Sequence, residues 1–356
     1  MKMRNFLRDI RHRALSCFCI IVIVVSPCAM KGAETKKPVL VPMIDGDWWI
    51  IAGNPMDHKY ATEKQEPVDF AVWQAADGTW QLWSCLRRTK AGGEQGKERF
   101  FYRWEGKKIT DTNWKPMGIA MEADPSLGET PGGVQAPHVI KVGDLYHLFY
   151  GDYLSICHAV SKDGKNFERV IQGNGKTGMF SEEMATNTPK IELKYGIHAR
   201  DVMLSSHNGK WYAYYTANLN NQGPVYVRTT TDFKNWSESE VVSFGGLAGT
   251  GAGSAECPFM VKLSESDFYL FTTKTYGDYD REKDDIRNRD IPQTNVYYSQ
   301  NPMKFGINQD AKYFIGQLPV AAPEIVFYDR QYYIFALKQG SLEGIRCAKL
   351  KWVKQK

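Results

Sequence analysis

Short apolar segments, each followed by a tight polar turn and an aromatic-rich segment, recur along the chain after about residue 40. Five copies stand at 68–85, 137–151, 201–216, 257–273 and 323–337. Turn pairs such as Asn208-Gly209 are hairpin signals, because asparagine and glycine adopt the positive φ angles that tight turns require. Each copy therefore predicts a β-hairpin, and no long segment after residue 40 has the period of a helix.

A further strand with its own turn follows most of these hairpins. It is clear at 157–170 and 225–239, after the second and third copies, and weaker after the first and fourth. Each unit thus contains about four strands, and the units begin roughly 55 to 70 residues apart, a period typical of propellers and solenoids. We expect an all-β, five-bladed β-propeller, in which each blade is a four-stranded antiparallel sheet around a central channel.

The two ends of the repeat region predict how the ring closes. Residues 45–53 lie before the first full unit, and residues 344–353 end the last one. These two segments are expected to complete one blade together, which removes open sheet edges. Residues 40–356 are accordingly expected to form a single propeller domain.

The first 33 residues have the layout of a secretory signal. A basic start is followed by an apolar run at about 14–25 and then by small residues. The run is too short for a comfortable membrane span, so we expect cleavage between about residues 27 and 33 and no stable span in the mature protein. The protein is expected to be exported, to the periplasm or the extracellular space. A lipid anchor at Cys28 and an uncleaved N-terminal anchor are the alternatives.

Composition changes this picture little. The net charge of +5 arises partly from the basic N-terminal segment, so it does not support a nucleic-acid partner. Aromatic residues make up 13% of the chain, which suits β-sheet packing or surfaces that stack on sugars. Outside the N-terminal segment, four cysteines are scattered singly, without zinc-site spacing, and their disulfide state stays open. They are Cys85, Cys157, Cys257 and Cys347.

Acidic residues stand at the predicted starts of three innermost strands. They are Asp69 in the first unit, Asp201 in the third and Glu256 in the fourth. Because the innermost strands of a propeller begin at one mouth of the channel, we expect these three carboxyl groups to converge on one cavity. Crowded carboxylates raise one another's pKa values, and glycosidic bond cleavage uses one protonated and one ionised carboxyl group.

The five-unit pattern, together with "HARDVML" at 198–204 and "AECPFMVKL" at 255–263, resembles the five-bladed propeller glycoside hydrolases, the group that contains families 43 and 32. The resemblance implies that Asp69 is the base or nucleophile, that Asp201 tunes the acid and holds the substrate, and that Glu256 is the acid. Likeness to family 43 favours an inverting mechanism. Two departures stand out: Asp69 lacks the usual Pro- and Asn-rich surroundings, and Val202 follows Asp201 where a proline is common.

Other residues near the predicted channel mouth are candidates for substrate binding. They are Arg200, His138, Gln135, His198, Arg87, Glu324 and Trp73. Most of them also have a structural interpretation: an ion pair with Asp201 for Arg200, a buried salt bridge for Glu324, and hydrogen-bonded structural histidines for His138 and His198. Trp73 has the alternative of inter-blade packing, and Arg87 that of a surface position. Glu324 has the further alternative of a contact to a channel ion.

The sequence therefore favours an exported glycoside hydrolase that acts on an oligosaccharide or polysaccharide. The alternative is a propeller that binds carbohydrate without cleaving it. No organic cofactor and no catalytic metal are expected, although a structural ion in the channel fits the fold. The sugar, its linkage and the oligomeric state stay open.

Overall fold

The computed structural model describes residues 38–94, 96–181, 199–217, 222–251, 253–274, 278–280, 285–287, 293–337 and 344–355. Residues 39–356 form one compact unit, and everything below concerns this unit. The predicted signal segment lies outside the described residues, as does His198. Among the described residues, the structure contains no helix with the length and apolar character needed to cross a membrane.

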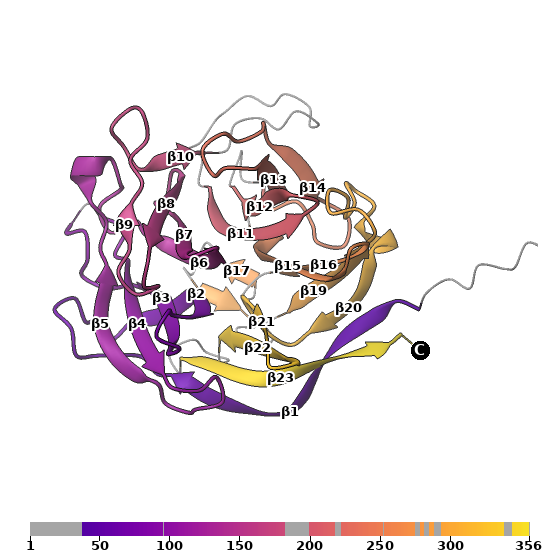
Figure 1. Ribbon diagram of the computed structural model, residues 1–356, viewed down its shortest axis with the longest axis horizontal. Helices are drawn as coiled ribbons and strands as arrows, with labels where there is room; N and C mark the ends of the chain where they lie inside the picture. Colours follow the sequence, from indigo (N-terminus) through magenta and orange to yellow (C-terminus); the bar gives the residue numbers. More distant parts are fainter. Residues whose placement is uncertain are drawn as a thin grey trace, which may run out of the picture. The chain divides into compact units, whose positions relative to one another are not determined.

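Five antiparallel sheets are arranged as the blades of a propeller, as predicted (Figure 1). The first blade comprises β2 (Glu66–Gln74), β3 (Trp80–Arg87), β4 (Phe100–Gly106) and β5 (Lys115–Met121). The second comprises β6 (Gln135–Val142), β7 (Leu145–Gly151) and β8 (Ile156–Ser161), with the short strands β9 (Glu168–Arg169) and β10 (Gly178–Phe180) both paired to β8. The third comprises β11 (Arg200–His207), β12 (Lys210–Thr216), β13 (Val225–Thr230) and β14 (Glu240–Ser243).

The fourth blade contains β15 (Glu256–Ser264), β16 (Asp267–Thr273), β19 (Thr294–Ser299) and β20 (Phe314–Leu318). Between β16 and β19, the backbone of β17 (Asp278–Asp280) pairs with that of β18 (Asp285–Arg287). Two short 3-10 helices, Pro125–Leu127 and Asp310–Lys312, lie in connections. Every strand pair in the five blades is antiparallel, so successive strands of a blade run alternately away from and back toward the face where the inner strand begins.

The last blade closes the ring with strands from both ends of the unit. It comprises β21 (Glu324–Tyr328), β22 (Gln331–Leu337), β23 (Ile345–Lys354) and β1 (Leu40–Ala52). The pairing of β1 with β23 extends from Leu40 opposite Lys354 to Ala52 opposite Ile345. The predicted closure is confirmed, and β1 begins earlier than the predicted segment.

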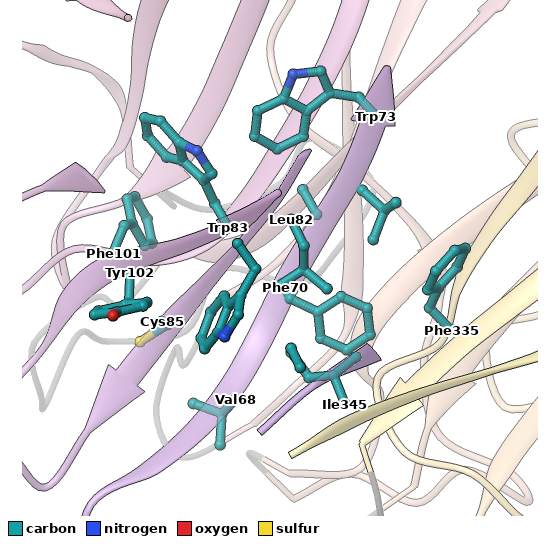
Figure 2. Packing of buried hydrophobic residues seen from close by; sticks show 14 of the residues in the cluster. Val68, Phe70, Trp73, Leu82, Trp83, Cys85, Phe101, Tyr102, Phe335 and Ile345 are labelled. Carbon is teal, nitrogen blue, oxygen red and sulfur yellow. The ribbon is translucent and has the colours of Figure 1, made fainter. Parts of the chain in front are cut away.

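Large aromatic side chains fill the space within and between blades (Figure 2). Trp73, at the far end of β2 from its start, is only 7% exposed. Its ring packs edge-on against Trp83 and Phe167, at centroid distances of 5.8 and 6.0 Å, and its Nε1–H donates to the carbonyl of Gly164 at 2.8 Å. Trp73 therefore belongs to the contact between the first and second blades. Its ring is covered by Trp83 and Phe167, so it is not a sugar platform at the channel mouth.

Candidate active site

A residue with a left-handed backbone conformation repeats near the start of each innermost strand. One residue per blade has a positive φ: Asp69 (30°), Ala136 (48°), Asp201 (57°), Cys257 (49°) and Ala322 (46°). In the first four blades this residue coincides with a shift in strand register, which is a β-bulge, whereas Ala322 lies just before β21. A bulge re-aims side chains at a strand end, and the left-handed conformation costs about 1–2 kcal/mol for a residue other than glycine. The four bulges and Ala322 therefore define equivalent positions in the five blades.

These five positions surround one cavity of about 30 Å³. Residues from the starts of all five innermost strands line it: Asp69, Phe70, Ala136, Pro137, Asp201, Val202, Met203, Cys257, Pro258, Phe259, Ala322, Pro323 and Glu324. The expected convergence on one cavity is thus present for Asp69 and Asp201, whereas Glu256 is not among the residues that line it. Glu324 joins the two aspartates from the fifth blade.

Asp69 and Asp201 lie close together, and the thiol of Cys257 from the fourth blade lies beside them. One carboxylate oxygen of each acid and the Sγ atom of Cys257 all lie within 4.8 Å of one another. Asp201 Oδ2 accepts hydrogen bonds from Thr216 Oγ1 and from the backbone N–H of Cys257, both at 3.1 Å. Cys257 Sγ also contacts Asp69 Oδ1 at 3.6 Å. The three groups form a compact set of hard and soft ligand atoms, although two carboxylates and a thiol occur at such distances without a metal too.

The surroundings of Asp69 raise the pKa of its carboxyl group to about 6. Burial is the main cause, and the negative charge of Asp201 is the second. The charges of Arg99 and Arg87 act in the opposite direction and limit the rise. Asp69 is consequently the carboxyl group whose protonation changes in the mildly acidic range.

Glu256 lies in an ion pair with Arg200. Arg200 Nη2 is 2.7 Å from Glu256 Oε1, and Arg200 Nε is 3.7 Å from Asp201 Oδ2. The Arg200 side chain is largely buried, so it connects the two acids away from bulk water. Arg200 therefore forms the ion pair with Asp201 that was the structural alternative, and it also pairs with Glu256.

The bulges explain this contact. Glu256 directly precedes Cys257, just as Arg200 directly precedes Asp201, so Glu256 and Arg200 occupy equivalent positions on adjacent blades. The sequence analysis treated Glu256 as equivalent to Asp69 and Asp201. In the structure, Cys257 is the residue equivalent to these two aspartates. A proline follows this position in three blades, as Pro137, Pro258 and Pro323. Aligning the blades on these prolines would have placed Cys257, and not Glu256, at the position equivalent to Asp201.

Two further candidates lie one step deeper, each two residues after one of the five equivalent positions. Glu324 lines the cavity, and burial raises the pKa of its carboxyl group well above the ordinary value. It makes no ion pair or hydrogen bond within the described part of the chain, so the expected salt bridge is not found there. His138 is 6% exposed and packs edge-on against Phe259 of the fourth blade at 6.3 Å. Burial lowers its pKa to about 4, so it is neutral at physiological pH.

The remaining candidates have protein partners. Arg87 contacts the buried carboxylate of Glu66 at 2.5 Å, so its charge is paired within the protein. Gln135 accepts a hydrogen bond from Nη1 of Arg99, a residue that sequence reasoning did not single out. The cysteines whose disulfide state was open, Cys85, Cys157, Cys257 and Cys347, are all free thiols.

Comparison with solved structures gives the same architecture. A thermostable family-43 glycoside hydrolase is 14% identical with a TM-score of 0.53, covering 82% of this chain and 90% of its own. An exo-1,5-alpha-L-arabinanase from a bovine ruminal metagenomic library is 15% identical with a TM-score of 0.54, covering 81% and 93%. A Bombyx mori beta-fructofuranosidase crystallised with sucrose is 16% identical with a TM-score of 0.51, covering 81% of this chain and 60% of its own. At these identities the likeness concerns the fold.

The family is identified from the sequence itself. No curated protein sequence matches the chain. The model of the glycosyl hydrolases family 32 N-terminal domain matches residues 101–331, more than half of the chain. The match includes Asp201, Glu256 and Glu324 and begins after Asp69. With five blades around one acid-lined cavity, the chain belongs to glycosyl hydrolase family 32 and is a glycosidase.

Proposed function

We propose that the protein is an exported glycoside hydrolase in which Glu256 protonates the leaving oxygen and Asp69 acts as nucleophile or as base for water. Asp201 orients the sugar and sets the charge around both groups. The observation that carries the proposal is the convergence of acids from separate blades on one cavity. Two carboxyl groups in different surroundings are what cleavage of a glycosidic bond requires.

The ion pair between Arg200 and Glu256 sets a condition on this mechanism. A general acid must donate its proton to the leaving oxygen, whereas the carboxyl group of Glu256 contacts Arg200 in this structure. The substrate must therefore separate Glu256 from Arg200, or shift Arg200 toward Asp201, before protonation of the leaving oxygen. Arg200 Nε already lies 3.7 Å from Asp201 Oδ2, so the guanidinium can keep an ion pair with Asp201 when its contact with Glu256 is broken.

The stereochemical outcome follows from the separation of the two carboxyl groups in the complex with substrate. About 5–5.5 Å between them leads to retention, and about 6.5–9.5 Å leaves room for a water and leads to inversion. Inversion was favoured from likeness to family 43, and the match to family 32 removes that reason for preferring it. The anomeric form of the first product, followed by NMR, decides between the two.

Replacing the acid tests the proposal most directly. In Glu256→Gln we expect turnover to fall by about 10²–10⁴-fold, since general acid catalysis contributes that much, while sugar binding is retained. The matched control is Glu265→Gln, an exposed glutamate at the far end of the same blade, which should leave turnover unchanged. Unchanged turnover in Glu256→Gln rejects its role as acid. A wild-type protein that binds oligosaccharides and cleaves none of a broad panel supports the carbohydrate-binding alternative.

Export is tested separately. We expect the protein recovered from outside the cytoplasm to begin between about residues 28 and 34, as N-terminal sequencing would show. A chain that stays in the cytoplasm with residue 1 intact contradicts export and leaves the proposed chemistry untouched.

A further inference from the structure

A second cavity, of about 200 Å³, lies on the same face of the propeller unit as the central one. Tyr60, Arg99, Glu122, Pro125 and Gly132 are among the residues that line it. They come from the connections that precede β2, join β3 to β4, and join β5 to β6. Because the strands of a blade alternate in direction, β3 and β5 end, and β2, β4 and β6 begin, on the face where the central cavity opens.

Two cations gather at the edge of this second cavity. Lys97 Nζ and the Arg99 guanidinium both lie 4.9 Å from the ring centroid of Tyr153, in the loop after β7. Neither cation has a carboxylate partner within the described parts of the chain. Contact with an aromatic face fixes the position of a cation and leaves its charge uncompensated.

Several other charged groups nearby lie in ion pairs. Arg87 and Arg88 both contact Glu66, at 2.5 and 3.4 Å. The acid of the second cavity, Glu122, contacts Lys59 Nζ at 2.8 Å. Lys97 and Arg99 therefore leave an excess of positive charge at this edge, which favours a negatively charged ligand.

Arg99 connects the two cavities. Its Nη1 donates to Gln135 Oε1, and Gln135 directly precedes Ala136, which lines the central cavity. Gln135 is 2% exposed, and its Nε2 donor has no hydrogen-bond partner among the described residues. A buried amide donor without an acceptor costs free energy, and an oxygen of a ligand that reached Gln135 would satisfy it. The charge of Arg99 also acts on Asp69, which places this edge close to the reacting groups.

We propose that Lys97, Arg99 and Gln135 form a subsite for a negatively charged sugar unit that adjoins the unit in the central cavity. The ligand group is a carboxylate of a uronic acid or a sulfate ester, because the guanidinium held over Tyr153 has further N–H donors that suit such oxygens. The proposal rests on the proposed function, and it makes the substrate an acidic oligosaccharide or polysaccharide.

Binding to the full chain carrying Glu256→Gln tests the subsite without turnover. The probes are a neutral galacto-oligosaccharide, its galacturonic acid counterpart and its sulfated counterpart, measured by calorimetry at low and high salt. We expect at least one anionic probe to bind about tenfold or more tightly than the neutral one, with the advantage shrinking in salt. The carboxylated and sulfated probes distinguish the two anions.

Substitutions locate the effect. Arg99→Gln should abolish the preference for the anionic probe, Lys97→Gln should weaken it, and Arg99→Lys should retain part of it. The matched control is Lys141→Gln: Lys141 lies 5.1 Å from the ring of Tyr146 in the same blade, near the opposite end of β6 and β7. It should leave the preference unchanged.

Equal binding of all probes, binding of none, or a preference that survives Arg99→Gln overturns the subsite. The proposed function is judged separately, by wild-type hydrolysis. Cleavage of a neutral sugar without anion preference overturns the subsite alone, whereas anion preference without cleavage of any sugar overturns the proposed function alone.

Discussion

The carboxyl groups around the central cavity differ in their neighbours more than in their positions. Asp69 is buried beside Asp201, Glu256 is paired with Arg200, and Glu324 has no partner in the described part of the chain. Such unequal surroundings separate acids from bases within one site. Each difference leads to a measurable consequence.

The rate at low pH should report on Asp69. A nucleophile or base must be ionised, and burial together with Asp201 raises the pKa of Asp69 to about 6. We therefore expect kcat/KM to fall about tenfold per pH unit below about pH 6, because this parameter follows the free enzyme. Arg99→Gln removes a charge that lowers this pKa, so it should move the acid limb to higher pH. An acid limb near pH 4, unmoved by Arg99→Gln, contradicts the assignment of Asp69.

Glu324 should make the protein less stable as the pH rises. Burial raises its folded-state pKa well above the ordinary value, so the unfolded chain loses this proton first and the folded state pays for ionisation at higher pH. Glu324→Gln should leave stability unchanged near pH 4 and increase the free energy of unfolding by about 1–3 kcal/mol at pH 8. Urea unfolding at both pH values measures this.

The control for Glu324 is Asp45→Asn, an exposed acid that contacts Lys351 at 2.8 Å and should change stability little. If Glu324→Gln instead destabilises the protein at pH 8, and a chelator removes the difference, then Glu324 holds a cation in the channel.

Residue types in the repeats were enough to predict that Asp69 and Asp201 meet at one cavity, but not that Glu256 lies outside its lining and pairs with Arg200. Asp69, Asp201 and Glu256 stand at strand starts that any five-bladed ring brings together. The pairing of Glu256 with Arg200 depends on a one-residue offset at a bulge, which changes the direction of every side chain at a strand end. Arg99 lies in a loop outside the repeated pattern, so the pattern contains no signal for it.

At the level of strands, the left-handed residue and the residue after it act together. Proline follows the left-handed residue in three blades, as Pro137, Pro258 and Pro323. The innermost strand is an edge strand that faces the channel, and proline has no N–H to leave unpaired on such an edge. The long strands could be predicted from apolar alternation and turn residues. The short strands β9, β10, β17 and β18 could not, since two or three residues carry no period.

Glycines in the closing blade should differ in their tolerance of a side chain. Gly344, before β23, has a φ of 97°, and an added Cβ would meet the backbone oxygen of Ala52. Gly46 in β1 has a similar φ of 88° but nothing within 4 Å of an added Cβ. Gly46→Ala should lower the free energy of unfolding by about 1 kcal/mol, because alanine is strained in the left-handed conformation. Gly344→Ala should lower it by roughly 1–3 kcal/mol more, because its Cβ also clashes with the backbone. Equal losses in chemical unfolding contradict the closeness of Gly344 to Ala52.

For the propeller unit as a whole, stability depends on the pairing of β1 with β23. This pairing gives the fifth blade its outer strand, so that this blade also has four strands. The general ring could be predicted because five units and two complementary end segments are visible in the sequence. The second cavity could not, since it forms between connections whose paths no strand pattern specifies.

Removing β1 should open the ring. A variant without residues 1–52 leaves the edge of β23 unpaired, so we expect aggregation or a strongly lowered Tm. A variant without residues 1–37 keeps β1 and should behave as the untruncated protein does. Size-exclusion chromatography and thermal unfolding compare the two. A monomeric shorter variant with an unchanged Tm shows that closure by β1 is dispensable.

The pairing of β1 with β23 also sets the order of events in a newly made chain. β1 is synthesised before every other strand of the ring, and β23 after all of them. Until β23 leaves the ribosome, β1 has no neighbour, and its free edge is a surface that chaperones and proteases recognise. In a prematurely terminated chain, β1 therefore stays unpaired, and its exposed edge marks the chain for chaperones and proteases.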